Sequence, residues 1–332
     1  MRLTEDKIIL VVRTTRMADL KMRHSSRSQA EFYVRHMGSD FADYEREDTS
    51  YEAAISEAQQ ILAKLGRVQI VRRAMLPNFI FGPQDIVVAL GQDGLVANTL
   101  KYLSGQPLIG VNPDPQRWDG QLLPFTVRHL DQIAREVLHR RRPVKQVTMA
   151  RVTLNTGPML FAVNDFFIGA QTHVSARYRI ELGQQGEDHS SSGVVVSTGL
   201  GSTGWLKSLL TGAAAITQSA GTLLAGQFTQ TSFVGKQPPP AATPKVRPNV
   251  RTEFAWDSDY LLFTVREPFP TKQTGATLVF GRVTAKQPLV IESRMGTGGV
   301  IFSDGIEQDF LEFNSGIRAT IDLGESKGML VV

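Results

Sequence analysis

The first part of the chain alternates between two hydrophobic patterns. Short apolar runs predict buried parallel strands at 7–12, 68–71, 85–90 and 107–111. Helical spacing predicts helices around 29–37, from a cap at Thr49 or Ser50 to about residue 65, at 95–103 and near 131–140. The segment 13–26 is predicted to be a loop. Strands that alternate with helices are typical of βαβ units in a parallel sheet.

The second part of the chain changes to many short strand-like runs separated by turn residues. This pattern predicts an antiparallel sheet or sandwich. The proline-rich stretch Gln237–Pro248 is predicted to be a loop insertion. The expected fold is therefore α/β plus all-β: a Rossmann-like α/β domain at 1–125, then a β-rich sandwich-like domain at 126–332. The last strand is a candidate to return to the first domain.

Composition narrows the function classes. The chain of 332 residues has no cysteine, which excludes disulfides, thiolate zinc sites and a cysteine nucleophile. The six histidines show no paired ligand spacing, so no protein-built metal site is expected. No apolar run reaches the ~20 residues that cross a bilayer, and a strand starts almost at the N-terminus, so we expect a soluble cytoplasmic protein. The net charge of +4 is spread out, and neither a membrane nor a nucleic acid is expected as partner.

The first candidate motif is the turn Gly91-Gln92-Asp93-Gly94, between a predicted strand and a helix. Backbone N–H groups at the start of a helix favour phosphate, and ligands of parallel sheets bind at this end of the strands. Asp93 would stand where a substrate hydroxyl meets a transferred phosphoryl group. The alternative is an ordinary turn, because Asp-Gly is a common turn dipeptide.

Two further motifs lie in the β-rich part. The segment Ser197–Trp205 is rich in glycine and hydroxyl side chains directly after a strand, which suits close approach to a polar ligand. The alternative is a plain glycine-rich turn, with Trp205 either stacked on a ring or filling core space. Asn164 and Asp165 interrupt an apolar run, which fits a strand end or bulge as well as a pair that faces a ligand.

Taken in order, Gly-x-Asp-Gly, Asn-acid and Gly-Ser-Thr resemble the NAD kinase family, most closely its mitochondrial-type branch and bacterial relatives. The segments VVRTTRMADL, IGVNPDPQRWDGQL, FIGAQTHVSARYRIEL, LLFTVREPF and FSDGIEQDFLEFNSG extend the resemblance over nearly the whole chain. It implies a phosphotransferase that uses ATP and Mg²⁺ to phosphorylate the adenosine ribose 2′-hydroxyl of NAD, giving NADP. It also implies an active site in the cleft between the two domains, and a homodimer or homotetramer.

The resemblance also assigns roles to residues. Asp93 would take the proton from the ribose hydroxyl as the catalytic residue, and the amides of Gly91 and Gly94 would face phosphate. Arg16 is a candidate phosphate ligand from its position and charge alone. The remaining nucleotide-binding candidates are Gln92, Asn164, Asp165, Thr198, Gly201, Ser202, Thr203, Trp205 and Ser208.

Departures from the family pattern leave the substrate open. Gln92 replaces a glycine and would cost roughly 1 kcal/mol if the backbone there needs a positive φ. Asp165 replaces a longer glutamate. The alternatives are therefore a kinase of the same family for a sugar, nucleoside or lipid hydroxyl, and a non-catalytic nucleotide-binding protein in which Gln92 disables phosphate binding.

Overall fold

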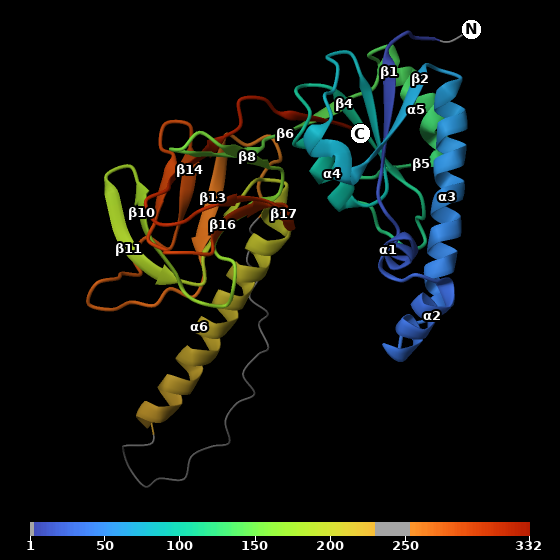
Figure 1. The fold of residues 1–332 in the computed structure, drawn as a ribbon. Coiled ribbons are helices and arrows are strands. Elements are labelled where there is room, and N and C mark those ends of the chain that lie inside the picture. The colour runs from blue at the N-terminus through green and yellow to red at the C-terminus, as the bar shows by residue number, and fades with distance from the viewer. Residues whose placement is uncertain (1–2, 230–252) are drawn as a thin grey trace. The chain divides into compact units, whose positions relative to one another are not determined.

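The computed structural model describes residues 3–229 and 253–332, and the chain divides into two compact units (Figure 1). Unit 1 comprises Met1–Met149 and Gly324–Val332, and unit 2 comprises Ala150–Leu323. The loop predicted at Gln237–Pro248 lies outside the described residues.

Unit 1 is an α/β domain around one mainly parallel sheet, in the order β2-β1-β3-β4-β19-β6 with β5 beside β4. The strands predicted from apolar runs are confirmed. The sheet contains β1 Lys7–Val12, β2 Arg67–Arg72, β3 Ile86–Leu90, β4 Pro107–Asn112, β5 Phe125–Thr126, β6 Val144–Val147 and β19 Gly328–Val331. The helices are α1 Arg16–Arg23, α2 Arg27–His36, α3 Phe41–Ala63, α4 Asp93–Leu100 and α5 Leu130–Leu138, with 3-10 turns η1 Arg73–Asn78 and η2 Val127–His129.

Helices cover both faces of this sheet. Apolar residues of α3 and α5 form one cluster with alternate residues of β1, β3 and β4, which are buried on both faces. Helix α4 lies on the opposite face (Figure 1). Burial on both faces is the reason why these strands read as continuous apolar runs.

The segment after β1 differs from the predicted loop, because it contains helix α1. The Thr15 side chain accepts a hydrogen bond from the backbone N–H of Ala18 at 3.1 Å and so caps the helix. Met17 and Leu20 are buried in a small cluster with residues of α2 and α3. Local capping and two buried side chains are enough to order a short helix here.

The cap predicted at Thr49 or Ser50 is wrong, because both residues lie inside α3. The helix begins at Phe41, and its cap is Asp40, nine residues before Thr49, where the Asp40 carboxylate accepts from the N–H of Ala42 at 2.9 Å. Phe41 in the first turn is buried. The acidic stretch that follows is helical because arginines from other segments pair with its carboxylates.

The boundary between the units falls later than residue 125. Helix α5 packs on α3 in the core of unit 1. Strand β6 pairs with β19, which runs parallel to β4, so the C-terminal strand lies in the first sheet. Residues 126–149 therefore group with unit 1. The apolar side chains of α5 are buried in the core of that unit, and the backbone of β6 pairs with a strand of its sheet.

Unit 2 is a sandwich of two six-stranded sheets, in the orders β11-β10-β15-β18-β7-β8 and β14-β13-β12-β9-β16-β17. All pairings in these sheets are antiparallel, as predicted, and their facing sides form one core. The strands are β7 Ala150–Leu154, β8 Met159–Ala162, β9 Asp165–Ala170, β10 Ala176–Leu182, β11 Gln185–Ser191, β12 Val194–Ser197, β13 Tyr260–Val265, β14 Phe280–Thr284, β15 Leu289–Ser293, β16 Gly299–Ser303, β17 Ile306–Glu312 and β18 Arg318–Leu323. The 3-10 turn η3 Gly201–Thr203 leads into helix α6 Trp205–Thr229.

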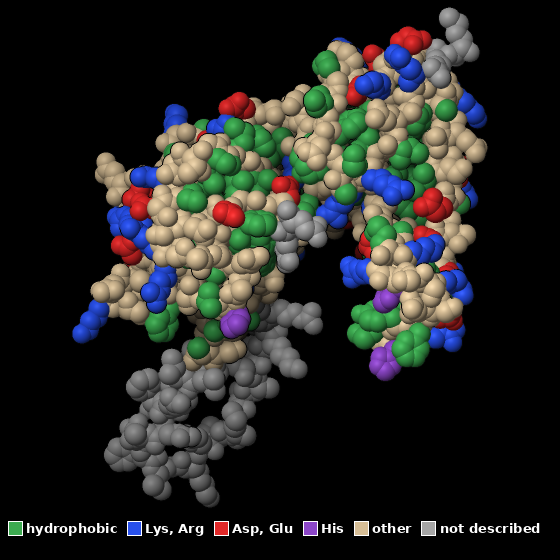
Figure 2. Space-filling view, viewed as in Figure 1, with side chains coloured by type: hydrophobic (Ala, Val, Ile, Leu, Met, Phe, Trp, Pro, Cys, Tyr) green, Lys and Arg blue, Asp and Glu red, His purple; other side chains and the backbone are tan. Residues whose placement is uncertain are grey.

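Charged side chains are mixed on the surface. On the face shown in Figure 2, Lys and Arg alternate with Asp and Glu rather than collecting in one patch. Among the described residues, no helix is long and apolar enough to cross a membrane.

Candidate functional site

The turn after β3 begins with a continuation of the sheet. The backbone N–H of Gly91 donates to the carbonyl of Val111 at 3.0 Å, which extends the pairing of β3 with β4. This N–H is therefore occupied, in contrast to the expectation that it would face phosphate. Gly94 is exposed in the first turn of α4, where amides have no partner within the helix. The positive end of α4 is thus presented by Gly94 and its neighbours rather than by Gly91.

Gln92 adopts an ordinary extended backbone. Its φ is −121° and its ψ is 163°, and it occupies the N-cap position of α4 without a side-chain capping bond. A glutamine reaches this conformation without the strain that a positive φ would impose. The exchange of glycine for glutamine is therefore compatible with the turn.

Asp93 is held by the backbone of the loop that follows β4. Its Oδ1 accepts from the N–H of Leu122 at 2.7 Å, and its Oδ2 accepts from the N–H of Gln121 at 3.2 Å. Two fixed donors set the orientation of the carboxylate and leave each oxygen a further lone pair. Asp93 is thus a fixed hydrogen-bond acceptor at the carboxyl end of a parallel strand.

The loop reaches Asp93 because Gly110 has no side chain. A Cβ at Gly110 would stand 2.0 Å from the carbonyl oxygen of Leu122. The Asn112 side chain braces the same loop, donating to the carbonyl of Trp118 at 2.9 Å and accepting from the N–H of Asp114 at 3.0 Å. The segment IGVNPDPQRWDGQL therefore positions the Asp93 carboxylate.

Arg16 belongs to an ion-pair cluster in unit 1. Its guanidinium donates to Glu47 and, at 2.8 Å, to Asp43. Arg117 also binds Asp43, and Arg13 binds Glu47 at 2.7 Å. Hydrogen bonds from Arg117 and then Arg16 hold the pKa of Asp43 well below its usual range. Arg16, a candidate phosphate ligand from its position and charge alone, is thus engaged by two carboxylates.

In unit 2, Val163 and Asn164 join β8 to Asp165, the first residue of β9, and this turn is held by Asp304. One oxygen of the Asp304 carboxylate accepts from the N–H of Asn164 at 2.6 Å, and both accept from the N–H of Val163 at 3.1 Å. The N–H of Asp304 donates in return to the carbonyl of Asp165 at 3.0 Å. Asp304 itself has a φ of 55°, a conformation that aspartate tolerates better than most residues.

The two carboxyl groups of this turn influence each other. Burial, together with the charge of Asp304, raises the pKa of Asp165 to about 7. Asp165 is therefore protonated in a large fraction of molecules at neutral pH, and a protonated carboxyl can donate a hydrogen bond as well as accept one.

The glycine-rich segment packs tightly against this turn. A Cβ at Gly201 would stand 2.1 Å from the carbonyl oxygen of Asn164. The hydroxyl of Thr198 donates to the carbonyl of Val163 at 2.5 Å and accepts from the N–H of Gly201 at 3.2 Å. The glycine at 201 and the buried hydroxyl at 198 therefore hold the loop in contact with Asn164.

These elements surround one pocket of about 350 Å³ in unit 2. Five of the residues singled out in the sequence line it, namely Asn164, Asp165, Gly201, Thr203 and Trp205, together with Asp304. Thr198 and Ser202 are fully buried behind the lining, where the Ser202 hydroxyl donates to the carbonyl of Gly199 at 2.7 Å. Ser208, in the first turn of α6, is exposed and does not line this pocket.

Sequence reasoning overlooked Asp304. The Asp-Gly dipeptide at 304–305 reads as a turn between two strands, and its partner lies 140 residues away. A positive φ at a non-glycine residue is visible only in the structure. Among the described residues, no cluster of three or more His, Asp or Glu side chains could hold a metal ion.

Comparisons with known proteins identify the fold. No protein-family model matches the chain, and no curated protein sequence matches it either. Among solved structures, the chain is similar to an NAD kinase from Archaeoglobus fulgidus in complex with ATP, with a TM-score of 0.54 and 14% identity over 98% of this chain and 93% of that one. It is also similar to yeast NADH kinase complexed with NADH, with a TM-score of 0.59 and 13% identity over 99% of this chain and 84% of that one. The α/β unit followed by antiparallel sheets is thus the NAD kinase fold.

Proposed function

We propose that this chain is a phosphotransferase that moves the γ-phosphoryl group of ATP to the adenosine ribose 2′-hydroxyl of NAD. The observation that carries the proposal is the pocket that brings together Asn164, Asp165, Thr203 and Trp205, from two separate sequence motifs, on a fold shared with an NAD kinase and an NADH kinase. The resemblance to the mitochondrial-type branch stays a prediction.

Asp93 is proposed as the group that takes the proton. The 2′-hydroxyl oxygen forms a bond to the γ-phosphorus, the bond from that phosphorus to the β,γ-bridging oxygen breaks, and ADP leaves with the electron pair. Asp93 accepts the hydroxyl proton at the lone pair that the amides of Gln121 and Leu122 leave open. Phosphoryl transfer depends mainly on positioning and charge neutralisation, so an oriented carboxylate is sufficient as a base.

The anionic phosphates are proposed to lie at the start of α4. Gly94 is exposed in the first turn of this helix, and the positive end of the helix favours negative charge. Mg²⁺, held mainly by ATP oxygens since the described residues contain no ligand cluster, would neutralise charge on the phosphates.

The dinucleotide is proposed to bind in the pocket of unit 2. Asn164 offers both a donor and an acceptor, and Asp165 offers a donor in its protonated form. The two together match the paired hydroxyls of a ribose, and Thr203 adds a further hydroxyl. Assembly as a homodimer or homotetramer and a cytoplasmic location complete the proposal.

The test is NADP formation from NAD with ATP and Mg²⁺, comparing the wild-type protein with Asp93→Asn. We expect the variant to lose a factor of about 10²–10⁴ in kcat, the usual contribution of a general base. Asp119→Asn is the matched control, because Asp119 is an exposed aspartate in the loop that braces Asp93. Wild-type turnover in Asp93→Asn would remove Asp93 from the mechanism, and no turnover in any of the three proteins would refute the proposed reaction.

A further inference from the structure

The turn between β16 and β17 consists of Asp304 and Gly305, since Ser303 pairs with Ile306. Both turn residues have a positive φ, 55° and 69°, which is typical of a two-residue type I′ hairpin turn. Asp-Gly is a preferred sequence for such a turn, so the local structure explains an aspartate at this position. It does not require the aspartate side chain to contact another strand.

The Asp304 carboxylate nevertheless binds the backbone that leads into β9. Its Oδ1 accepts from the N–H of Asn164 and lies 3.4 Å from the backbone nitrogen of Asp165, and both oxygens accept from the N–H of Val163. Backbone N–H donors favour the ionised form of a carboxylate. A negative charge is therefore held beside Asp165, whose side chain is itself a carboxyl group.

The backbone of this connection is held on its other side as well. A Cβ at Gly201 would stand 2.1 Å from the carbonyl oxygen of Asn164, and the Thr198 hydroxyl donates to the carbonyl of Val163. Because both sides are packed, the connection cannot move away from Asp304 to separate the two carboxyl groups. Uptake of a proton by Asp165 is the remaining way to relieve the repulsion.

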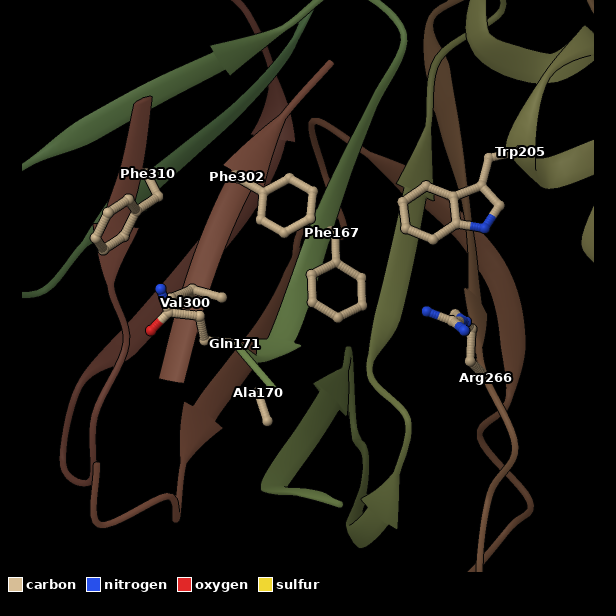
Figure 3. A pocket seen from close by; sticks show the side chains of 8 residues that line it. All are labelled: Phe167, Ala170, Gln171, Trp205, Arg266, Val300, Phe302 and Phe310. Atoms are coloured by element: carbon tan, nitrogen blue, oxygen red, sulfur yellow. The ribbon is translucent and has the colours of Figure 1, made fainter. Parts of the chain in front are cut away.

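The charged groups around Asp165 favour this protonation. Burial first and the charge of Asp304 second raise the pKa of Asp165. Its pairing partner on β12 is the uncharged Ser197, and the described residues that line the pocket of unit 2 include no Lys, Arg or His. Arg266 lies against the Trp205 ring at 5.4 Å, but it lines a neighbouring pocket (Figure 3) and not this one.

A pocket with two acidic side chains and no cation in its described lining is unfavourable for a phosphate group. It suits the uncharged, hydroxyl-bearing part of a nucleotide. A carboxyl group that keeps its proton can donate a hydrogen bond to an oxygen of such a ligand, and a carboxylate cannot. The protonation of Asp165 therefore decides whether the pocket offers this donor.

We propose that Asp304 is a positioning residue that keeps Asp165 a hydrogen-bond donor, so that binding of the dinucleotide takes up a proton. The proton passes from solvent to the Asp165 carboxylate, and the O–H that forms donates to a ribose oxygen. Asp304 acts through Asn164 and Asp165. The inference rests on the proposed function for its choice of ligand.

The test is calorimetric binding of NAD⁺ in the absence of ATP from pH 6 to pH 8.5, in buffers that differ in ionisation enthalpy. The dependence of the heat on the buffer gives the number of protons taken up, and NAD⁺ has no group of its own that titrates in this range. Asp165 is largely protonated below its pKa of about 7, so we expect little proton uptake at pH 6 and an uptake that approaches one proton above pH 8. The affinity should fall by up to about tenfold per pH unit above pH 7.

Two variants separate the charge from the shape of the side chains. Asp165→Asn keeps a donor at every pH, so its binding should take up no proton and its affinity should not change with pH. Asp304→Asn removes the charge that acts on Asp165, so proton uptake should begin at a lower pH. Its affinity at pH 7.5 should be about 3- to 10-fold below wild type and should recover at pH 6. Glu312→Gln is the matched control, because Glu312 is an exposed carboxyl group on β17 that does not line the pocket.

A role of Asp304 in the hairpin turn alone predicts different results. An affinity that falls by the same factor at every pH in Asp304→Asn would overturn the inference, as would wild-type binding without proton uptake or an absence of NAD⁺ binding. The double variant of Asp165→Asn and Asp304→Asn should show no pH dependence. If Asp304→Asn fails to fold in circular dichroism and thermal melting, the comparison of wild type with Asp165→Asn still decides.

Failure of this inference can be told apart from failure of the proposed function. Proton-linked NAD⁺ binding that disappears in Asp165→Asn, without any formation of NADP, would preserve the inference and refute the reaction. NADP formation by a wild-type protein that takes up no proton on binding NAD⁺ would do the opposite. In the NADP assay, Asp304→Asn should raise the KM for NAD more than it lowers kcat, since Asp304 positions the ligand and does not touch the reacting groups.

Discussion

The carboxyl group of Asp165 provides a quantitative test of the geometry in unit 2. Its pKa rises from 3.8 to about 7 because it is buried beside Asp304. In the unfolded chain the same group loses its proton near its ordinary pKa. Between these two values the unfolded state is the one that releases the proton, so stability falls as the pH rises from about 4 to about 7.

Replacement of Asp165 by asparagine removes this dependence, since an amide has the shape of the protonated acid and no proton to lose. One unit of pKa corresponds to about 1.4 kcal/mol, so the interval from 3.8 to about 7 sets an upper limit of about 4 kcal/mol. Asp165 keeps partial contact with solvent, and screening reduces the effect, so we expect about 1–2 kcal/mol.

The assay is urea unfolding of the wild-type protein and Asp165→Asn at pH values from 4 to 8. We expect similar stabilities near pH 4 and a variant that becomes progressively more stable than wild type up to about pH 7. Asp259→Asn, at an exposed position in the same unit, is the control and should show no such trend. A difference between wild type and Asp165→Asn that stays constant across this range would refute the assignment of a buried, destabilised carboxylate.

Two further substitutions test unit 1. Gly110→Ala should destabilise the protein by about 1–3 kcal/mol in urea unfolding, because the new Cβ would collide with the carbonyl of Leu122. It should also lower NADP formation, since the collision would displace the N–H of Leu122 that binds Asp93. Gly212→Ala in α6 is its control, since nothing lies within 4 Å of a Cβ there, and wild-type stability of Gly110→Ala would contradict the packing. Gln92→Gly should leave the free energy of unfolding within about 1 kcal/mol of wild type and preserve turnover, because the backbone of Gln92 is unstrained. A large loss of turnover in this variant would mean that the Gln92 side chain is itself a ligand.

The elements that the sequence predicts well are those with a strong local signal. The buried runs at β1, β3 and β4 are apolar on both faces, and no tertiary information is needed to recognise them. Helix α1 was missed because its stability comes from two buried side chains and a Thr15 cap rather than from a long periodic pattern. The start of α3 was misplaced because its acidic first turns are stabilised by arginines distant in sequence.

The candidate site also combines local sequence signals with contacts between residues that are distant in the chain. Residue types and spacing point to Asp93, the Asn164-Asp165 pair and the glycine-rich segment, but each of them alone fits an ordinary turn or strand end as well. Only their order along the chain, which resembles the NAD kinase family, makes them candidates for one site. Which of them can meet a ligand is decided by long-range packing, which buries Thr198 and Ser202 while leaving Thr203 and Trp205 in the pocket lining.

The sequence by itself thus determined the order of the elements, the two kinds of sheet and the candidate motifs, since these depend on local hydrophobic periodicity and turn chemistry. The tertiary structure alone decided the position of Asp304 beside Asn164 and the hydrogen bonds that orient Asp93. Each of these joins residues far apart in the chain. Such contacts depend on how whole strands and loops pack, and the local pattern of residue types in the sequence does not predict them.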